Sequence, residues 1–360
     1  MKRAILLLLT HSCNLSCKYC YEKFKDSRKM SSPKAIDILE QEFAVNSEDI
    51  TNIDLLGGEP LANFDIIPVL CDWIWSKKTE MQIFIRTNGT LLSPHMKCWF
   101  SQHRKLLGLG LSIDGTPITN LINRGVKNVD LEYFKENWPD VPVKITVFPD
   151  TVDSLFESVI YLYNKGFNIT GGLAQGVMWN DVACNKLNKQ MEKLTELYLS
   201  DSSRNPITPL FSLDFNQAFT TYDATKGDIP CWNRNIVHTY DCDYEKLPCH
   251  MFSVLVQGQQ KQKLIARAST MTKEIIDSDC RNCPIRWSCI NCMALNFQRY
   301  GTFDKNINRE LACKAHKITA YWSAVLLTSR AQLDLMDLSI SENRESVSNA
   351  ITYIKTYGEY

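Results

Sequence analysis

The stretch that decides the fold is Cys13-Asn14-Leu15-Ser16-Cys17-Lys18-Tyr19-Cys20, which places three cysteines within eight residues. It follows the apolar run Ala4–Leu9, which predicts a buried strand. A structural zinc site takes four protein ligands, whereas a 4Fe–4S cluster held by three cysteines leaves one iron open to another ligand. Three thiolates without a fourth nearby therefore favour a metal centre with an open position. The alternatives are three structural cysteines or a partial zinc site.

Length and composition narrow the class of protein. The 360-residue chain exceeds the usual size of one hydrophobic core, so a large domain and a smaller one are expected. Lys plus Arg equals Asp plus Glu, at 40 each, which disfavours nucleic acid and anionic membrane as partners. No apolar run approaches the roughly 20 residues of a membrane span. The apolar run after Met1-Lys2-Arg3 is shorter than a signal-peptide core of roughly 7–15 residues, so we expect a cytoplasmic protein.

Strand-like and helix-like segments alternate along the first 200 or so residues, which predicts a parallel α/β sheet. The expected strands are 4–9, 53–56, 81–86, 109–113, 143–148 and 168–177. The expected helices are 32–43, 66–75, 93–100, 155–165 and 185–199. A terminal helix is expected over 318–335, whereas the tail from Ser339 is polar and shows no pattern.

Unusual residues follow the ends of four expected strands. They are the cysteine loop, Gly57-Gly58-Glu59-Pro60, Thr87-Asn88-Gly89 and Asp114-Gly115. In α/β barrels the active site is built from loops at the C-terminal ends of the strands, and glycine lets a ligand approach the backbone closely. Each glycine pair alone is more often an ordinary turn. Their shared position after the strands predicts one pocket.

The cysteine loop resembles the CxxxCxφC loop of the radical S-adenosylmethionine (SAM) superfamily, with Tyr19 as the aromatic φ. Residues 57–60 are similar to the GGEP motif of that family. Residues 87–92 (TNGTLL) and 112–115 (SIDG) are similar to segments of the branch that carries a C-terminal SPASM domain. The resemblance covers roughly residues 4–180. It implies an α/β fold with a partial (β/α)6 TIM-type barrel, open on one side, followed by a small cysteine-rich SPASM domain.

The resemblance implies a role for each matched position. Cys13, Cys17 and Cys20 would hold a 4Fe–4S cluster whose open iron binds the amino and carboxylate groups of SAM. Glu59 would pair with the SAM ammonium, and Ser112 would bind the SAM ribose or carboxylate. Arg124 would reach the SAM carboxylate, with a surface charge as the alternative reading and Lys144 as a weaker candidate. The implied cofactor-binding residues are Tyr19, Gly57, Gly58, Glu59, Pro60, Asn88, Ser112, Asp114 and Arg124.

A second group of cysteines lies in the C-terminal part of the chain. Its members are Cys231, Cys242, Cys249, Cys280, Cys283, Cys289, Cys292 and Cys313. Paired CxxC spacing is strong evidence for metal ligands, and eight thiolates could fill two four-cysteine zinc sites. The arrangement resembles the SPASM domain, in which eight cysteines hold two auxiliary 4Fe–4S clusters. The resemblance places Cys231, Cys242, Cys249 and Cys292 on one cluster, and Cys280, Cys283, Cys289 and Cys313 on the other.

Two features depart from the family pattern. Cys289 and Cys292 are one residue closer than the usual CxxxC, which leaves open the auxiliary cluster that Cys292 ligates. In anaerobic sulfatase-maturating enzymes, an aspartate thought to act as a base follows the third cysteine of the first set, but His250 stands here. His250 is a weak candidate for a catalytic proton acceptor, and a structural histidine is the alternative.

The expected domains are a radical SAM barrel over 1–222, a SPASM auxiliary domain over 223–320, and a C-terminal helix and tail over 321–360. The resemblance implies that SAM is cleaved to a 5′-deoxyadenosyl radical that abstracts hydrogen from a side chain of a ribosomally made peptide. The product would carry a carbon–carbon or thioether crosslink, or an oxidised residue. The alternatives are a protein maturase of the anaerobic sulfatase type, a radical dehydrogenase of a small molecule, and a zinc-binding or electron-transfer protein that is no enzyme.

The resemblance also implies partners. A small redox protein such as flavodoxin or ferredoxin would supply electrons, and the two auxiliary clusters would accept the electron released from the substrate. The sequence begins at the first expected strand, so we expect no N-terminal leader-binding domain. A separate leader-binding protein would then recognise the peptide, or the barrel and SPASM surfaces would bind it directly.

Overall fold

The computed structural model describes residues 2–211, 213–219, 236–263, 265, 280, 282–286, 289, 292–301 and 312–358. Cys231, one of the expected metal ligands, lies outside the described residues. Within this part of the chain, no helix is both long enough and apolar enough to cross a bilayer.

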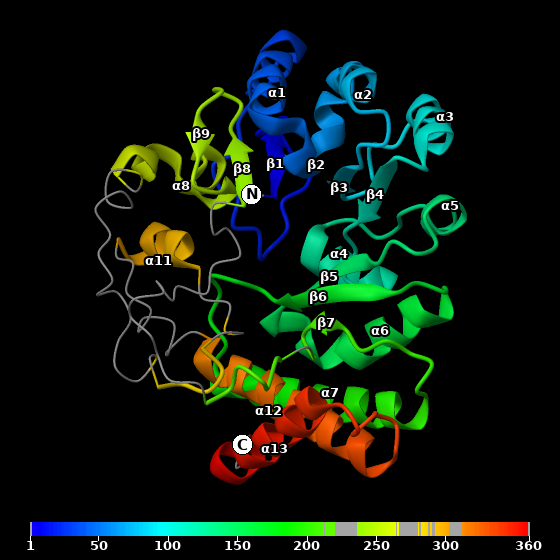
Figure 1. The fold of residues 1–360 in the computed structure, drawn as a ribbon, viewed down its shortest axis with the longest axis vertical. Coiled ribbons are helices and arrows are strands. Elements are labelled where there is room, and N and C mark those ends of the chain that lie inside the picture. Colours follow the sequence, from blue (N-terminus) through cyan, green and yellow to red (C-terminus); the bar gives the residue numbers. More distant parts are fainter. Residues whose placement is uncertain are drawn as a thin grey trace.

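A curved, mostly parallel sheet forms the centre of the molecule (Figure 1). Its first four strands are hydrogen-bonded in chain order: β1 (Arg3–Leu8), β2 (Ile50–Leu56), β3 (Ile83–Thr87) and β4 (Leu107–Leu111). A second parallel group contains β5 (Val143–Val147), β6 (Ile169–Leu173) and the short β7 (Thr208–Pro209). An isolated parallel bridge between Ser112 and Lys144 joins the two groups. The predicted partial barrel of six parallel β/α units is therefore confirmed.

Two further strands extend the sheet beyond β1. The strand β8 (Val237–Tyr240) runs parallel to β1, pairing Leu7 with Tyr240, and β9 (Lys246–Leu247) pairs antiparallel to β8. The sheet therefore continues across the domain boundary expected near residue 222, and that division of the chain stays a prediction.

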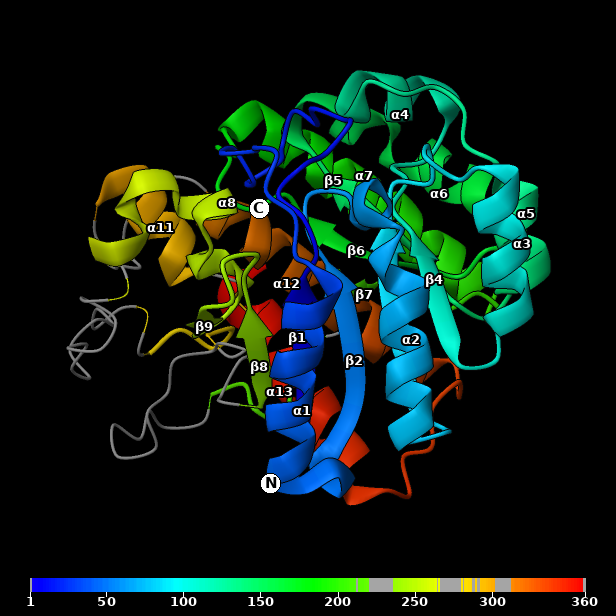
Figure 2. The same cartoon turned by 90° about the horizontal axis from the view of Figure 1, so that it is seen from above.

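Helices cover the outer face of the barrel strands (Figure 2). They are α1 (Ser32–Asn46), α2 (Ile66–Lys77), α3 (Pro94–His103), α4 (Pro117–Arg124), α5 (Leu131–Asn137), α6 (Leu155–Asn164) and α7 (Asp181–Ser200). Short 3-10 turns lie at Ser47–Asp49, Pro60–Asn63, Pro149–Ser154, His250–Phe252 and Gly258–Gln260. The sequence predicts five of these seven helices, and it does not predict α4 or α5.

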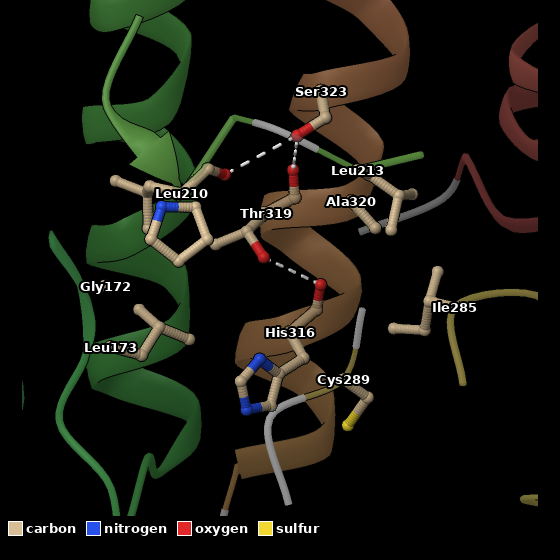
Figure 3. A pocket seen from close by; sticks show the side chains of 11 residues that line it. Gly172, Leu173, Leu210, Leu213, Ile285, Cys289, His316, Thr319, Ala320 and Ser323 are labelled. Atoms are coloured by element: carbon tan, nitrogen blue, oxygen red, sulfur yellow. Dashed lines mark hydrogen bonds between the residues drawn. The ribbon is translucent and has the colours of Figure 1, made fainter. Parts of the chain in front are cut away.

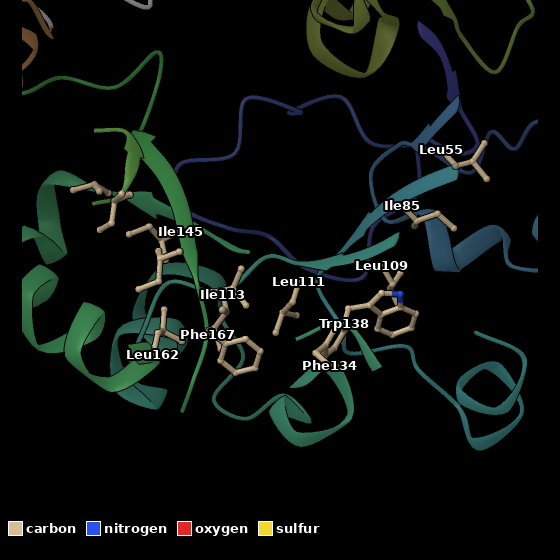
Figure 4. Packing of buried hydrophobic residues seen from close by; sticks show 14 of the residues in the cluster. Leu55, Ile85, Leu109, Leu111, Ile113, Phe134, Trp138, Ile145, Leu162 and Phe167 are labelled. Carbon is tan, nitrogen blue, oxygen red and sulfur yellow. The ribbon is translucent and has the colours of Figure 1, made fainter. Parts of the chain in front are cut away.

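The main core lies between the strands and these helices. Figure 4 shows Leu109 and Leu111 of β4 packed near Phe134 of α5 and Trp138. The Trp138 indole Nε1–H donates to the Leu107 carbonyl oxygen at 2.7 Å, so even the polar atom of this buried ring has a partner. Nearly every residue of β1 is buried, as expected for a strand covered on both faces.

The C-terminal part adds α8 (Val254–Gln257), α11 (Met293–Tyr300), α12 (Lys314–Gln332) and α13 (Ser341–Tyr357). The predicted terminal helix corresponds to α12, which packs between α7 and α13. The helix α13 corrects the sequence analysis, which found no pattern in the tail from Ser339 and predicted no helix there. It buries Ala350 and Tyr353 against Phe215 and the neighbouring part of α12.

Candidate metal and cofactor site

The loop that carries Cys13, Cys17 and Cys20 leaves the C-terminal end of β1 at the open end of the barrel. All three thiols are partly buried, and burial raises the pKa of the Cys20 thiol to about 11. The Cys20 N–H donates to the Cys17 carbonyl oxygen at 3.0 Å, and the Leu15 N–H donates to Cys13 Sγ at 3.5 Å. These bonds shape the loop between Cys13 and Cys20, and the binding of a metal by its three thiols stays a prediction.

Gly57 and Gly58 let the loop after β2 lie against the cysteine loop. The Gly58 N–H donates to the Thr10 carbonyl oxygen, and the Glu59 N–H donates to the Ser12 carbonyl oxygen, both at 2.9 Å. A Cβ on Gly57 would lie 2.4 Å from the Thr10 carbonyl oxygen, and Gly57 has a φ of +144°. The glycines are therefore required for contact between two protein loops.

Glu59 is 1% exposed and holds the loop after β3. Its Oε1 accepts a hydrogen bond from the Thr87 hydroxyl at 2.7 Å and one from the Leu61 N–H at 3.2 Å. Its Oε2 accepts from the Asn88 N–H at 2.8 Å. Burial raises the pKa of Glu59 even though these donors favour the carboxylate. Binding of the SAM ammonium by Glu59 stays a prediction.

Asn88 links the loop after β3 to the cysteine loop. Its side-chain Nδ2 donates to Asn14 Oδ1 at 3.0 Å, and Asn14 Nδ2 donates to the Thr90 hydroxyl at 2.7 Å. The Asn88 Oδ1 in turn accepts from the Thr90 N–H at 2.9 Å. Sequence reasoning did not single out Asn14 or Thr90, although both lie inside the quoted motifs.

Tyr19, Asp114 and Arg124 form a buried group at the ends of β1 and β4. The Tyr19 hydroxyl donates to Asp114 Oδ2 at 2.7 Å, and Arg124 Nη1 donates to the Tyr19 oxygen at 2.6 Å. Arg124 Nη1 lies 3.7 Å from Asp114 Oδ1, which also accepts from the Thr146 N–H at 3.0 Å. Arg124 is therefore a buried partner of Asp114 and Tyr19, which excludes the surface-charge reading.

Ser112 lies where the two strand groups meet. Its N–H donates to the Thr87 carbonyl oxygen at 2.9 Å, and the next residue, Ile113, donates to the Lys144 carbonyl oxygen at 3.0 Å. The structure thus brings the strand-end segments predicted from the sequence to one edge of the barrel. The roles of the individual side chains toward SAM stay predictions.

Tyr21 connects the cysteine loop to the C-terminal part of the chain. Together with Cys249 and Cys292 it packs against the apolar cluster of Met251, Phe252 and Leu295. The Tyr21 hydroxyl lies 3.5 Å from His250 Nε2. Burial, and next the charge of Lys144, lower the pKa of His250 to about 4, so its imidazole is neutral at pH 7. A pKa this low makes His250 a weaker proton acceptor than an ordinary histidine, and its role as a base stays a prediction.

The cysteines expected to hold the second auxiliary cluster lie near the N-terminal end of α12. They are Cys280, Cys283, Cys289 and Cys313. The Cys283 N–H donates to the Cys280 carbonyl oxygen at 3.3 Å, and burial raises the pKa of the Cys283 thiol, with Cys313 and Cys280 close enough to add to the effect. Cys289 lines a small cavity of about 40 Å³ with His316 of α12 (Figure 3). The binding of one metal cluster by these four cysteines stays a prediction.

A larger cavity of about 300 Å³ opens beside Cys20. Its walls come from the cysteine loop, from the segments after β5 and β6, and from α11. The Tyr19 and Phe148 rings contact at a centroid distance of 5.8 Å on one side. On the other side, Gln298 of α11 donates to the Tyr21 carbonyl oxygen at 3.2 Å. The barrel and the C-terminal part therefore share this cavity.

Comparisons with known proteins agree with the geometry. The family described as a 4Fe-4S single cluster domain (Fer4_12) matches residues 2–129. The radical SAM cyclopropyl synthase TigE of Paramaledivibacter caminithermalis is 25% identical over 192 residues, which cover 47% of this chain and 40% of TigE. The chain spans less than half the length of the curated relatives it matches.

Solved structures extend the likeness to the C-terminal part. The structure of anSMEcpe with bound AdoMet has a TM-score of 0.66 at 15% identity, covering 97% of this chain and 99% of that chain. Streptococcus suis SuiB bound to the precursor peptide SuiA has a TM-score of 0.60 at 16% identity, covering 84% of this chain and 74% of that chain. These likenesses show a common fold.

Proposed function

From the premise that this chain is a radical SAM protein with the fold of the SPASM-type maturases, we propose that it removes hydrogen from a side chain of a ribosomally made peptide. The modification then forms a carbon–carbon or thioether crosslink, or an oxidised residue. SAM bound to an iron–sulfur cluster supplies, on reduction, the carbon radical that such a step requires. A flavodoxin or ferredoxin is the proposed source of electrons. A separate leader-binding protein, or the chain's own surface, brings the peptide.

One observation carries this proposal: three loops from β1, β2 and β3 are hydrogen-bonded into a single unit around the cysteines. The Gly58 and Glu59 amides hold the cysteine loop, and Asn88 holds Asn14 beside Cys13. These hydrogen bonds fix the position of each cofactor ligand before the cofactor binds. Control of a reactive radical requires such fixed positions. A structural zinc site in this loop would call for a fourth protein ligand.

We assign the following residues to the cofactors of the proposed set. Cys13, Cys17 and Cys20 would hold the SAM-binding cluster, and the buried carboxylate of Glu59 lies within the same group of loops. Cys280, Cys283, Cys289 and Cys313 would hold one auxiliary cluster. The other auxiliary set includes Cys231, outside the described residues, and Cys242, whose surroundings differ from those of Cys249 and Cys292. Three 4Fe–4S clusters in total are the proposal.

The peptide substrate is favoured by the cavity beside Cys20. The cavity is shared between the barrel and α11 and is lined by charged and polar side chains such as Lys18, Asp150 and Arg299, whereas small metabolites favour closed, largely apolar pockets. SuiB, which has the same fold, is bound to a precursor peptide. A radical dehydrogenase of a small molecule and a protein maturase of the anaerobic sulfatase type are the alternatives.

Co-expression with a genetically linked short peptide tests the proposal. The peptide should lose about two mass units per modification, because two hydrogens leave when one new bond forms. Deuterium placed at the attacked carbon should appear in 5′-deoxyadenosine, and the matched Cys17→Ala variant should leave the peptide unmodified. SAM cleavage with an unchanged peptide and consumption of a small metabolite would favour the dehydrogenase.

A further inference from the structure

His11, Asp241 and Cys242 form a buried group where β1 and β8 end side by side (Figure 1). His11 and Asp241 are fully buried, and Cys242 is 5% exposed. Their nitrogen, oxygen and sulfur atoms all lie within 4.8 Å of one another. The histidine and the aspartate are 230 residues apart in the chain. This group lies outside the set of residues assigned to SAM.

The two ring nitrogens of His11 both face carboxylates. Nε2 lies 2.5 Å from Asp241 Oδ1, and Nδ1 lies 3.4 Å from Asp26 Oδ1. Nδ1 is buried and has no hydrogen-bond partner within the described part of the chain. A neutral imidazole has one N–H and one lone pair, so one nitrogen would direct its lone pair at a carboxylate. Together with Asp241 and Cys242, His11 thus offers three buried donor atoms of the kinds that bind metal ions.

The local charge favours a metal ion. Lys261 lies 3.6 Å from Asp241 Oδ2, but it is closer to Asp243 at 2.9 Å and to Glu245 at 2.8 Å. Arg28 is paired with Asp26. Four carboxylates thus face two cationic side chains among the described residues, so their charges, with His11 left out of the count, sum to −2. A divalent cation would compensate that charge.

We propose that His11 Nε2, the Asp241 carboxylate and Cys242 Sγ bind a zinc ion, with water as the fourth ligand. The ion would replace the direct 2.5 Å contact between Nε2 and Asp241 Oδ1 and move these two atoms apart. A mixed nitrogen, oxygen and sulfur set suits zinc, and a carboxylate on the other nitrogen of a ligating histidine is a recurrent support for such sites. Asp26 Oδ1 faces that nitrogen at 3.4 Å, without a hydrogen bond in this structure, and would take the supporting position after a small shift. The Asp241 carboxylate is itself oriented by the Cys242 N–H at 2.8 Å and the Val254 N–H at 3.3 Å.

If Cys242 binds zinc, it is not a ligand of the auxiliary cluster. Its thiol lies 3.1 Å from the Leu8 carbonyl oxygen, against the end of β1. Cys249 and Cys292 pack with Tyr21 in a separate apolar cluster. Asp241 and Cys242 lie in the β8–β9 hairpin, and His11 precedes Cys13 by two residues. The zinc ion would therefore link this hairpin to the cysteine loop. The neighbouring auxiliary cluster would then be held by fewer cysteines.

Metal analysis of the full-length, anaerobically purified protein, grown with both zinc and iron, tests the proposal. We expect about one zinc per chain after a brief chelator wash. X-ray absorption at the zinc edge should show one sulfur at about 2.3 Å and nitrogen or oxygen at about 2.0 Å. The Cys242→Ala variant should lose the zinc and keep its iron. The exposed Cys98→Ala serves as the matched control and should keep both metals.

A second test uses Asp26→Asn, which changes none of the proposed zinc ligands. Asp26 is partly exposed, so this variant should fold. Removing this support should weaken zinc binding about 10–100-fold in a chelator competition. Loss of about four irons from Cys242→Ala, without zinc in the parent protein, would assign Cys242 to the auxiliary cluster and overturn the proposal. Absence of zinc with unchanged iron would also overturn the proposal.

Discussion

At the scale of single residues, hydrogen bonds decide what the motif side chains can do. The sequence predicts that Glu59 lies near the cofactor, and the structure places it at the correct strand end. The sequence does not show that both oxygens of this carboxylate accept hydrogen bonds from the neighbouring loops. Asn14 and Thr90 were missed for the same reason, because their partners lie far away in the chain.

We expect Glu59→Gln to weaken SAM binding by about 1.5–3 kcal/mol while the ultraviolet–visible spectrum of the cluster stays unchanged, because a charge-assisted hydrogen bond is lost without loss of a cluster ligand. The amide group of the new glutamine would also place an N–H donor against the Asn88 N–H or the Thr87 hydroxyl, both of which donate to Glu59 in the parent protein. Isothermal titration with SAM measures the change. Unchanged affinity would assign ammonium binding to other groups at the strand ends.

Asp114→Asn should lower the free energy of unfolding by about 3 kcal/mol, because it leaves the buried guanidinium of Arg124 without its carboxylate. The control is Asp130→Asn, since Asp130 forms an exposed ion pair with Lys97 and asparagine preserves its N-cap role. We expect the control to cost less than about 1 kcal/mol in urea unfolding. Equal effects in the two variants would contradict a special role for the buried group.

At the scale of helices and strands, local patterns predict most of the barrel. The six strands and five of the seven barrel helices follow from apolar runs that end in glycine or proline turns. The helices α4 and α5 are short, and no pattern in the sequence singled them out. The helix α13 was missed because only Ala350 and Tyr353 are buried along its length. The pairing of β8 with β1 depends on contacts between distant segments, which local patterns cannot reveal.

Glu42 of α1 secures this pairing. Arg3, His238, Tyr240 and Lys246 all contact its carboxylate, the first three at 3.0, 2.7 and 2.5 Å. Burial disfavours the charge, but hydrogen bonds from Tyr240, His238 and Arg3 outweigh it and lower the pKa of Glu42 to about 2. No sequence pattern indicates this role, because Glu42 is one polar residue among several in an amphipathic helix.

The low pKa of Glu42 predicts a pH dependence. The unfolded chain, in which this glutamate titrates at its ordinary value, takes up the proton first as the pH falls. The stabilisation is therefore present above about pH 4.5 and is lost as the pH falls toward about 2, on the order of 3 kcal/mol in total. Urea unfolding at about pH 6, 4 and 3 should show a smaller loss of stability in Glu42→Gln than in the parent protein. The exposed Glu40→Gln should behave like the parent protein.

At the scale of the whole molecule, the cavity beside Cys20 is shared by the barrel and the C-terminal part, so both contribute to what can enter it. The fold matches anSMEcpe over 97% of this chain. The sequence anticipated this architecture through its linked motifs. It could not place the individual auxiliary cysteines, because the spacing of cysteines does not specify how they are shared between sites.

Anaerobically purified protein should contain about twelve irons, four for each of three clusters. Combined replacement of Cys13, Cys17 and Cys20 by alanine should remove about four of these and leave the rest, because each cluster has its own ligands. Iron analysis and electron paramagnetic resonance of the reduced protein provide the readout. Zinc in place of iron throughout would contradict the prediction.

The parallel pairing of β1 with β8 also sets an order for biosynthesis. A ribosome that adds roughly 5–20 residues per second completes β8 roughly 10–50 s after β1. Throughout that interval the nascent polypeptide presents one edge of its most apolar strand to solvent, where it can pair with other chains. Chaperone protection should therefore be needed until translation has passed residue 240.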